Sequence, residues 1–241
     1  MDNKIKVVVV MPAYNAGATL ERTVSEIPRN IVDEIILTDD SSEDDTLAIA
    51  RKLNLTVFRH EKNEGYGGNQ KTCYRHALER GADIVIMIHP DYQYDPKLIQ
   101  QLIRPIIDGK YDAMLGSRIQ GFKKTIAGGM PLYKYLGNRF LTFVENAASG
   151  ETLKEWHTGM RAYTKEVLNS VDFAGNSNNF VFDTQILFQI LGRGFRIGEI
   201  TVPVRYFKES SSINFSKSAE YGLETLWVAA KYLFSGRNKK R

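Results

Sequence analysis

The chain has 241 residues, which is the length of one large α/β domain or of two small ones. Hydrophobic residues make up 43% of it and charged residues 25%, so we expect a folded chain. The 32 basic residues nearly balance the 28 acidic ones, which gives no argument for nucleic-acid binding without a local basic cluster. The single cysteine, Cys73, excludes an intrachain disulfide and a multi-cysteine metal site, and it agrees with a reducing compartment.

Neither secretion by a signal peptide nor membrane insertion is favoured by the sequence. The polar start, Met1 to Lys4, lacks the form of a signal peptide. No uncharged apolar stretch reaches the roughly 18–20 residues that span a bilayer. We therefore expect a cytoplasmic protein.

Apolar runs alternate with amphipathic segments through the first half of the chain. The run 5–11 is continuous and β-branched, as in a strand that is buried on both faces of a parallel sheet. We expect strands at 5–11, 34–38, 55–59, 83–88 and 112–116, and helices at 17–27, 43–53, 69–80 and from 95 onward. The fold class is therefore α/β, with a Rossmann-like, mostly parallel central sheet and helices on both faces.

The second half of the chain has a different pattern. We expect a mobile glycine- and lysine-rich segment at 121–131, helices at 132–147 and 180–191, and a strand at 195–206. A polar loop at 150–161 holds Trp156 and His157. No linker is visible, so residues 1–241 are expected to form a single domain. Residues 1–118 would bind a ligand, 119–215 would cover the site, and 216–241 would form an amphipathic helix with a basic tail.

Polar motifs follow several of the predicted strands. They are Tyr14-Asn15, Asp39-Asp40, the loop after Arg59 and His89-Pro90-Asp91. In an open α/β sheet, ligands bind beyond the carboxyl ends of the strands. These motifs therefore favour a nucleotide-type site at that edge over a bare scaffold.

The acidic residues of these motifs have two interpretations. Asp39 and Asp40 could accept hydrogen bonds from a base imide and a ribose hydroxyl, or they could cap the following helix. Asp91 could hold Mg²⁺ or Mn²⁺ together with substrate phosphates, and His89 could complete a Mn²⁺ site. The alternative for Asp91 is an ordinary polar turn.

The segment from Asn63 to Gly68 contains three glycines but matches neither G-x-G-x-x-G nor a P-loop. A dehydrogenase or a kinase is therefore disfavoured. Gly65 and its neighbours would allow close backbone approach to a ligand, or simply a tight turn.

Four basic residues near predicted element ends are compatible with an anionic ligand, although each could be a solvated surface charge. They are Arg118, Arg161, Arg205 and Lys208. Asp183, which has apolar neighbours in the sequence, is expected either to pair with an arginine or to be functional. The helix at 216–234 could bind an anionic membrane surface or pack in the core.

Several of these motifs resemble glycosyltransferase family 2, whose members are inverting nucleotide-sugar transferases with the GT-A fold. The resemblance lies in Val9 to Asn15 (VVMPAYN), Ile36 to Thr46 (ILTDDSSEDDT) and Asn63 to Asn69 (NEGYGGN). Within the family, the second half is similar to dolichol- and polyprenol-phosphate sugar synthases. That similarity lies in Gly116 to Arg118 (GSR), Thr158 to Tyr163 (TGMRAY) and Val202 to Tyr206 (VPVRY).

The resemblance implies a role for each matching residue. Pro12 and Tyr14 would flank the base, and Asn15, Asp39, Asp40, Asn63 and Gly65 would complete the nucleotide-sugar site. Asp91 would bind the metal, Mg²⁺ or Mn²⁺, with Gln93 beside it. Arg118, Arg161, Arg205 and Lys208 would face phosphates of donor or acceptor. The sequence departs from the family's D-x-D motif, because His89 stands where the first aspartate is usual.

The resulting hypothesis is an inverting transfer of a mannose- or glucose-like hexose from a GDP- or UDP-sugar to a polyprenyl or dolichyl phosphate. The enzyme would act peripherally on the inner face of a membrane, and a separate membrane subunit is a conceivable partner. A lipid phosphate needs no strong base, whereas a sugar hydroxyl would need one, for which Glu155 and Asp183 are the candidates. The alternatives are a sugar-to-sugar transferase of polysaccharide synthesis and a weakened nucleotide-sugar- or lipid-binding module.

Overall fold

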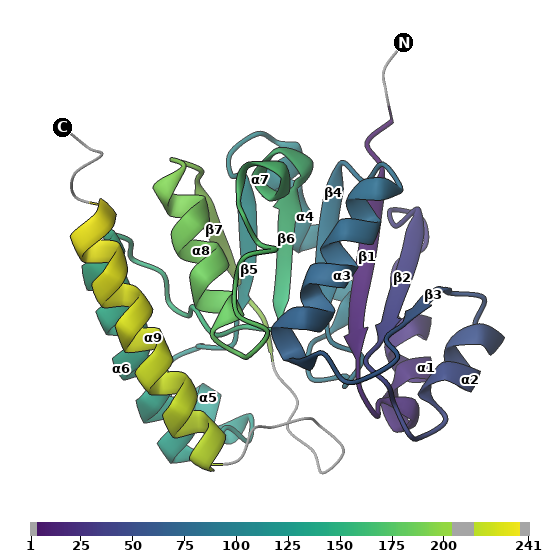
Figure 1. Ribbon diagram of the computed structural model, residues 1–241, viewed down its shortest axis with the longest axis horizontal. Coiled ribbons are helices and arrows are strands. Elements are labelled where there is room, and N and C mark those ends of the chain that lie inside the picture. The colour runs from purple at the N-terminus through teal and green to yellow at the C-terminus, as the bar shows by residue number, and fades with distance from the viewer. Residues whose placement is uncertain (1–3, 204–214, 237–241) are drawn as a thin grey trace.

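The computed structural model describes residues 4–203 and 215–236 of the chain. They form one α/β domain around a seven-stranded sheet with strand order β3-β2-β1-β4-β6-β5-β7 (Figure 1). The strands are β1 Val7–Ala13, β2 Glu34–Asp39, β3 Thr56–Arg59, β4 Ile84–Ile88, β5 Ala113–Ser117, β6 Met160–Thr164 and β7 Ile197–Thr201. The α-helices are α1 Gly17–Ser25, α2 Thr46–Lys52, α3 Gly65–Glu79, α4 Ile99–Ile107, α5 Phe122–Ala127, α6 Leu132–Ser149, α7 Lys165–Ser170, α8 Phe182–Gly192 and α9 Phe215–Gly236. The predicted fold class is thus confirmed.

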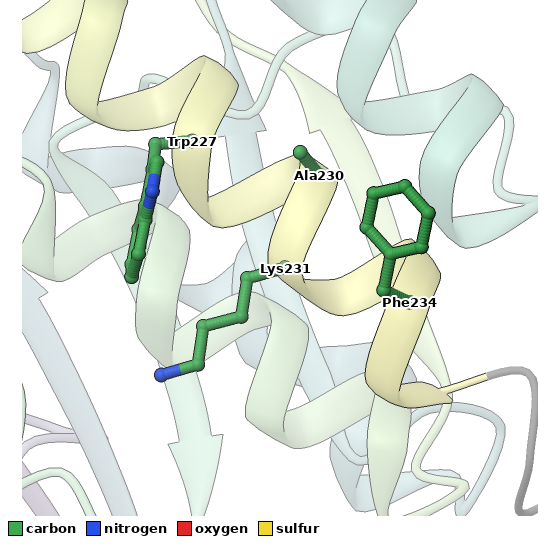
Figure 2. Close-up of a pocket in the computed structure, with 4 residues that line it drawn as sticks. All are labelled: Trp227, Ala230, Lys231 and Phe234. Atoms are coloured by element: carbon green, nitrogen blue, oxygen red, sulfur yellow. The ribbon is translucent and has the colours of Figure 1, made fainter.

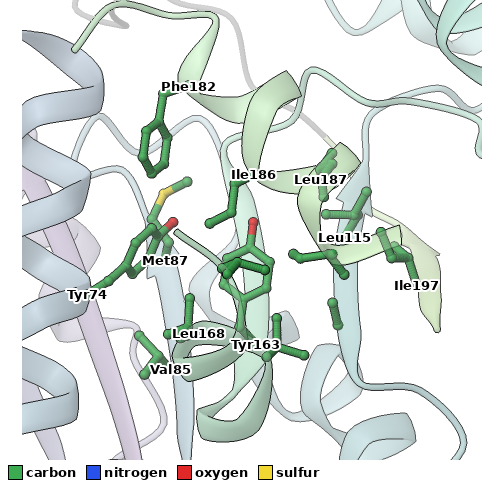
Figure 3. Packing of buried hydrophobic residues seen from close by; sticks show 14 of the residues in the cluster. Tyr74, Val85, Met87, Leu115, Tyr163, Leu168, Phe182, Ile186, Leu187 and Ile197 are labelled. Atoms are coloured by element: carbon green, nitrogen blue, oxygen red, sulfur yellow. The ribbon is translucent and has the colours of Figure 1, made fainter. Parts of the chain in front are cut away.

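Strand β1 is buried along its whole length because helices cover both faces of the sheet. Val8 and Val10 pack in the core under α3 and α8, while Val7 and Val9 pack in the core under α1 and α4. Figure 3 shows the first of these cores, where Tyr74 of α3 and residues of α8 meet the central strands. This two-sided burial explains why the strand reads as an unbroken apolar run.

The sequence pattern did not predict strand β6. It pairs antiparallel with both β4 and β5, whereas the other strand pairs are parallel. The strand is short and includes a charged residue, Arg161, so it reads as part of a polar loop. Because β6 runs in the opposite direction, the residues before it, Trp156 to Gly159, lie at the edge where the parallel strands end.

Other boundaries also differ from the prediction. Pro12 does not end β1 but pairs within it with Thr38. The segment 121–131, expected to be a mobile loop, contains helix α5. Helix α2 begins at Thr46, three residues later than predicted. Within the part of the chain that the structure describes, no helix is both long enough and apolar enough to cross a bilayer.

Helix α3 begins at Gly65, four residues earlier than predicted, so the glycines lie in its first turn. A side chain at Gly67 would collide with the carbonyl oxygen of Ser177 and with Cβ of Phe182, the latter at 2.8 Å. Gly65 has a φ of 84°, and a Cβ there would lie 2.7 Å from the carbonyl oxygen of Asn178. The backbone that approaches these glycines is therefore the chain's own loop 177–179.

We predict that Gly67→Ala lowers the free energy of unfolding by at least about 2 kcal/mol, because the loop 177–179 must move away. The matched control is Gly137→Ala in α6, where an added Cβ meets nothing within 4 Å. In a helix interior that change should be neutral or stabilising by roughly 0.5–1 kcal/mol. Urea unfolding followed by circular dichroism measures both. Equal stabilities of the two variants would contradict the packing argument.

The start of β1 is fixed by a carboxylate at the opposite edge of the sheet. Asp33 accepts a hydrogen bond from the Val7 amide at 2.9 Å, and its own amide donates to the Val7 carbonyl oxygen at 2.9 Å. The hydrogen bonds from Lys4 and Val7 lower the pKa of Asp33. Since the pKa is lower in the folded state, this stabilisation is present above the unfolded pKa near 3.9 and is lost as the pH falls through the folded value.

We therefore predict that Asp33→Asn destabilises the protein by about 1 kcal/mol at pH 7 and by much less below pH 3, where the wild-type carboxyl group is itself protonated. Urea unfolding of both proteins across this pH range measures the difference. A difference that is independent of pH would contradict the assigned role of the charge.

Candidate active site

The parallel strands and the start of β6 meet at one edge of the sheet, and the backbone is strained there. Asn15, Ser41 and Tyr92 follow β1, β2 and β4, and they have positive φ angles of 49°, 63° and 58°. Non-glycine residues rarely adopt this conformation, and such strain gathers at functional sites. Three strained turns at one edge therefore point to a ligand site, as the polar motifs predicted.

Asp39 and Asp40 are adjacent and buried, but only one of them has its carboxylate filled by protein contacts. Asp40 accepts from the amides of Glu64 at 2.8 Å and Gly65 at 3.1 Å, and it lies 2.7 Å from Nδ1 of His60. It thus satisfies the N-terminus of α3. In Asp39, Oδ2 accepts from the Ser42 amide at 3.2 Å, while the buried Oδ1 has no partner in the structure.

The Oδ1 atom of Asp39 can accept a hydrogen bond from a ligand, because no protein donor in the structure occupies it and a buried polar atom gains from a partner. Sequence reasoning could not separate the two carboxylates, since both follow β2. The structure separates them: Asp40 caps α3, and Asp39 retains an open acceptor.

Tyr14 and Asn15 form the turn after β1. Tyr14 is 53% exposed, which leaves its ring available for stacking. Asn15 holds the turn in place, because its amide donates to Ser42 Oγ and its side-chain oxygen accepts from the Glu43 amide, each at 2.9 Å. Asn63 is also occupied: its amide group donates to the Asp40 carbonyl oxygen, and its oxygen accepts from the Gly65 amide.

His89, Asp91 and Gln93 follow β4. Asp91 and Gln93 are almost fully buried, and Oδ1 of Asp91 accepts from the Gln93 amide at 3.1 Å. Burial lowers the pKa of His89, although the negative charges of Asp91 and Asp183 act in the opposite direction. His89 is thus held as the neutral imidazole, which is the form that binds a metal.

The ring of His89 contacts residues from both halves of the chain. The hydroxyl of Tyr66 lies 3.3 Å from its Nε2, and the two rings stack at 5.4 Å. A Cβ at Gly159 would lie 3.1 Å from the same nitrogen, so only glycine lets the loop before β6 pack against this ring. Burial and the charge of Asp183 raise the pKa of Tyr66, which keeps its hydroxyl protonated.

Beneath this layer, Asp183 and Arg161 form a buried ion pair at 2.9 Å. Asp183 also accepts from the Tyr66 hydroxyl at 2.8 Å and from the Gln70 amide group at 3.0 Å. Arg161 is fully buried and donates to the carbonyl oxygens of Trp156 and Thr158. The arginine partner expected for Asp183 is thus confirmed. The predicted contact of Arg161 with an acceptor phosphate does not agree with its place in the core.

A second ion pair lies at the end of β5. Arg118 donates through Nε to Glu155 at 2.8 Å, and its Nη2 donates to the carbonyl oxygen of His157. Glu155 is fully buried and also accepts from Asn138 of α6 at 2.9 Å. Burial and the charge of Arg118 lower the pKa of Lys134, and no carboxylate in the described ranges forms an ion pair with this lysine.

Lys134, Tyr66 and Gly159 belong to this edge although the sequence analysis did not select them. Lys134 sits in the first turn of α6, where only the structure brings it near Arg118. Tyr66 lies within the glycine-rich segment, where an aromatic residue could have been selected from the sequence as a candidate site residue. The predicted phosphate contacts Arg205 and Lys208 lie outside the described residues.

The donor atoms after β4 fit a divalent cation that takes most of its ligands from a substrate. Asp91 supplies a carboxylate and His89 a neutral imidazole, a mixture that suits Mn²⁺. The described part of the chain contains no cluster of three or more histidine, cysteine or acidic side chains that could hold a metal ion without other ligands. A metal at this position would therefore need substrate phosphates and water as further ligands.

The fold defines a GT-A-like α/β protein, and the sequence comparison identifies its family. The profile of Glycosyl transferase family 2 matches residues 8–171. The chain belongs to this family, as the motifs predicted.

Curated relatives match the chain over most of their length. One is the UDP-N-acetylglucosamine–dolichyl-phosphate N-acetylglucosaminyltransferase of Methanococcus voltae, 28% identical over 84% of this chain and 86% of that protein. Another is a dolichyl-phosphate hexose transferase of Haloferax volcanii, 29% identical over 82% of each chain. Such relatives agree with the resemblance to lipid-phosphate sugar synthases.

Solved structures support the fold independently. Glucosyl-3-phosphoglycerate synthase from Mycobacterium tuberculosis, in complex with phosphoglyceric acid, matches with a TM-score of 0.75 at 20% identity. The match covers 96% of this chain and 81% of that one. The same enzyme in complex with Mn²⁺, UDP-glucose and phosphoglyceric acid matches with a TM-score of 0.73 at 20% identity, over 96% of this chain and 80% of that one.

We predict that Asp40→Asn mainly lowers stability, whereas Asp39→Asn mainly weakens nucleotide binding. Asp40→Asn should cost roughly 2–3 kcal/mol of unfolding free energy, because its NH2 group would face either the Glu64 or the Gly65 amide and the charge beside His60 would be lost. Asp39→Asn should cost under about 1 kcal/mol, because Oδ1 has no protein partner and Oδ2 forms a long ion pair of 3.5 Å with the exposed Arg59 side chain. It should nevertheless weaken nucleotide binding at least about tenfold. Urea unfolding and calorimetric titration with nucleoside diphosphates measure these effects, and equal destabilisation by both changes would contradict the assignment.

Proposed function

We propose that this glycosyltransferase moves a mannose- or glucose-like hexose, with inversion, from a GDP- or UDP-sugar to a polyprenyl or dolichyl phosphate. The transfer takes place on the cytoplasmic face of a membrane, where such lipids are dissolved. The motifs of the second half support this acceptor, and so do the names of the relatives from Methanococcus voltae and Haloferax volcanii.

The observation that carries the proposal is that both carboxylates considered as general bases are held in buried ion pairs. Glu155 is bonded to Arg118 and Asn138, and Asp183 is bonded to Arg161, Gln70 and the Tyr66 hydroxyl. The oxygens of both carboxylates are thus occupied by protein donors, so neither is available to a sugar hydroxyl. A phosphate acceptor does not need a general base, because its oxyanion is already the nucleophile.

The donor nucleotide occupies the ends of β1 and β2. Asp39 accepts a hydrogen bond from the base or ribose through its unpartnered Oδ1. Tyr14 and Pro12 flank the base, and the exposed ring of Tyr14 offers a stacking surface. The other predicted residues of this site support the loops that would contact the nucleotide. Asn15 is hydrogen-bonded to Ser42, and Asp40, Asn63 and Gly65 are hydrogen-bonded to one another.

The diphosphate lies at the end of β4. Asp91, with His89, would hold Mg²⁺ or Mn²⁺, which when bound neutralises the charge that develops on the leaving diphosphate. Mn²⁺ is supported by the imidazole in the donor set and by the M. tuberculosis enzyme that is described with Mn²⁺ and UDP-glucose. The Asp91 carboxylate is oriented by the Gln93 amide, and Tyr66 fixes the ring of His89.

The acceptor phosphate lies between β5 and α6. Glu155 positions Arg118. The charge of Lys134 lies near that of Arg118, and no carboxylate of the described residues forms an ion pair with Lys134. Arg205 and Lys208 are further candidates that the family motif supplies. Two cations beside one phosphate stabilise its bound anion, and no base is needed to activate it.

We predict that Asp91→Asn lowers transfer to polyprenyl phosphate by about 100-fold or more while the protein stays folded, because the carboxylate that holds the metal is lost. Sugar transfer from a radiolabelled donor and the thermal unfolding midpoint are measured on the same preparations. Asp108→Asn, at the end of α4, is the control and should transfer at the wild-type rate. Near-normal turnover by the Asp91 variant would disprove the metal role.

The acceptor class is tested by offering polyprenyl phosphate and neutral oligosaccharides side by side with each donor. We expect transfer to the lipid phosphate alone, because Glu155 and Asp183 are both held in ion pairs and neither is free to take a proton from a sugar hydroxyl. Preferential transfer to oligosaccharides would support a polysaccharide-building transferase instead. Donor binding without transfer to either acceptor would favour a nucleotide-sugar-binding module.

A further inference from the structure

Helix α6 has its polar and apolar faces reversed. Its buried polar side chains are Asn138, Thr142 and Glu145. Its exposed side chains include Leu132, Leu136, Phe140 and Phe143, which recur every three or four residues and are 53–70% exposed. A surface helix in water is expected to show the opposite arrangement. The outer stripe of α6 therefore matches an apolar environment.

Helix α9 adds a second stripe of the same kind. Thr225 and Ala229 are buried, while Leu223, Trp227 and Phe234 are 65–85% exposed. Figure 2 shows Trp227, Lys231 and Phe234 projecting from α9, where with Ala230 they line a pocket on its surface. These exposed residues lie one helical turn or two apart, so they form a continuous row.

The two helices pack side by side at the end of the domain beyond β7 (Figure 1). An added Cβ at Gly222 of α9 would lie 4.0 Å from Leu141 of α6, which marks the line of contact between them. Each apolar stripe lies opposite the buried residues of its own helix, so both stripes point outward. We call the two stripes together the apolar face. A patch of this kind marks an interaction surface.

The charges around the apolar face indicate what covers it. Helices α5, α6 and α9 carry six basic residues and three acidic ones, and one of the acidic residues, Glu145, is buried. Lys123 and Lys124 of α5 are exposed, and Lys231 lies over the ring of Trp227 at 5.4 Å. Aromatic and aliphatic side chains bordered by lysines are typical of helices that lie in a membrane interface.

We infer that the apolar face binds the surface of an anionic lipid bilayer, with α6 and α9 lying in the plane of the interface. The inference rests on the proposed transfer to a lipid phosphate and deepens it. The stripe of α6 starts at Leu132, and Lys134 in the same turn lies near Arg118. A lipid whose tail remains in the bilayer along α6 therefore presents its phosphate to these two cations.

The test uses the full chain and vesicles of phosphatidylcholine with and without phosphatidylglycerol, and it needs no substrate. The variant Phe140→Ser with Phe143→Ser should bind vesicles at least about tenfold more weakly, because two exposed aromatic side chains that would insert into the bilayer are lost. The matched control is Ile107→Ser, an apolar residue of α4 that is 46% exposed and lies on a different helix layer. It should bind as the wild type does. A thermal unfolding midpoint within a few degrees of the wild type shows that each variant is folded.

Flotation of the wild type with anionic vesicles, lost in the Phe140/Phe143 variant and kept in the Ile107 variant, supports the inference. No flotation of the wild type, or equal flotation of all three proteins, overturns it. A wild-type dimer in sedimentation that the Phe140/Phe143 changes dissociate also overturns it, because a second copy then covers the face.

A water-soluble, short-chain prenyl phosphate separates this inference from the proposed function. If the inference is right, the Phe140/Phe143 variant transfers sugar to this acceptor at the wild-type rate and loses transfer only to vesicle-borne acceptor. If instead the proposed function is wrong, the wild type fails with both acceptors while its vesicle binding is unchanged.

Discussion

The buried ion pair between Arg161 and Asp183 is the interaction on which the site depends. Arg161 lies on the antiparallel strand β6, and Asp183 lies at the start of α8. Asp183 also binds Tyr66 and Gln70 of α3, so one carboxylate joins the two halves of the chain. The loss of one partner from such a pair would leave an uncompensated buried charge, which is strongly destabilising. The ring of His89 is placed by Tyr66, and thus by the same pair.

The charges at this edge of the sheet are divided between support and ligand binding. Asp40 caps α3, Glu155 holds Arg118, and Asp183 holds Arg161, so these three carboxylates stabilise the protein itself. Asp39, with a buried oxygen that lacks a partner, and Lys134, with no described carboxylate as ion-pair partner, are left for a ligand. This division supports the proposed acceptor, which arrives as an anion.

Much of the fold could be predicted from the sequence, because the buried parallel strands read as continuous apolar runs and their alternation with helices indicates a mostly parallel sheet. Strand β6 could not be predicted, since its burial depends on the Arg161 ion pair, which a sequence does not show. The helical start at Gly65 was missed for a related reason: the close approach of loop 177–179, not local propensity, accounts for those glycines.

The site was predictable in part. Strand-end motifs correctly placed Tyr14, Asp39 and Asp91 at one edge, but position alone could not separate Asp39 from Asp40, or show that Arg161 is a core residue. Those distinctions depend on which partner each side chain meets across the fold. The exposed apolar stripe of α6 was missed because the spacing of its apolar residues is also that of a buried face.

The most direct test of the account is the thermal unfolding of the wild type and of Asp39→Asn with a panel of GDP- and UDP-sugars, with and without Mn²⁺. A ligand that binds only the native state adds about 2.7 kcal/mol of stability at 100 times its Kd. The account predicts that one nucleotide sugar raises the Tm of the wild type in the presence of Mn²⁺, and that Asp39→Asn loses most of the shift. The absence of a shift with every donor, or an equal shift in the variant, would contradict it.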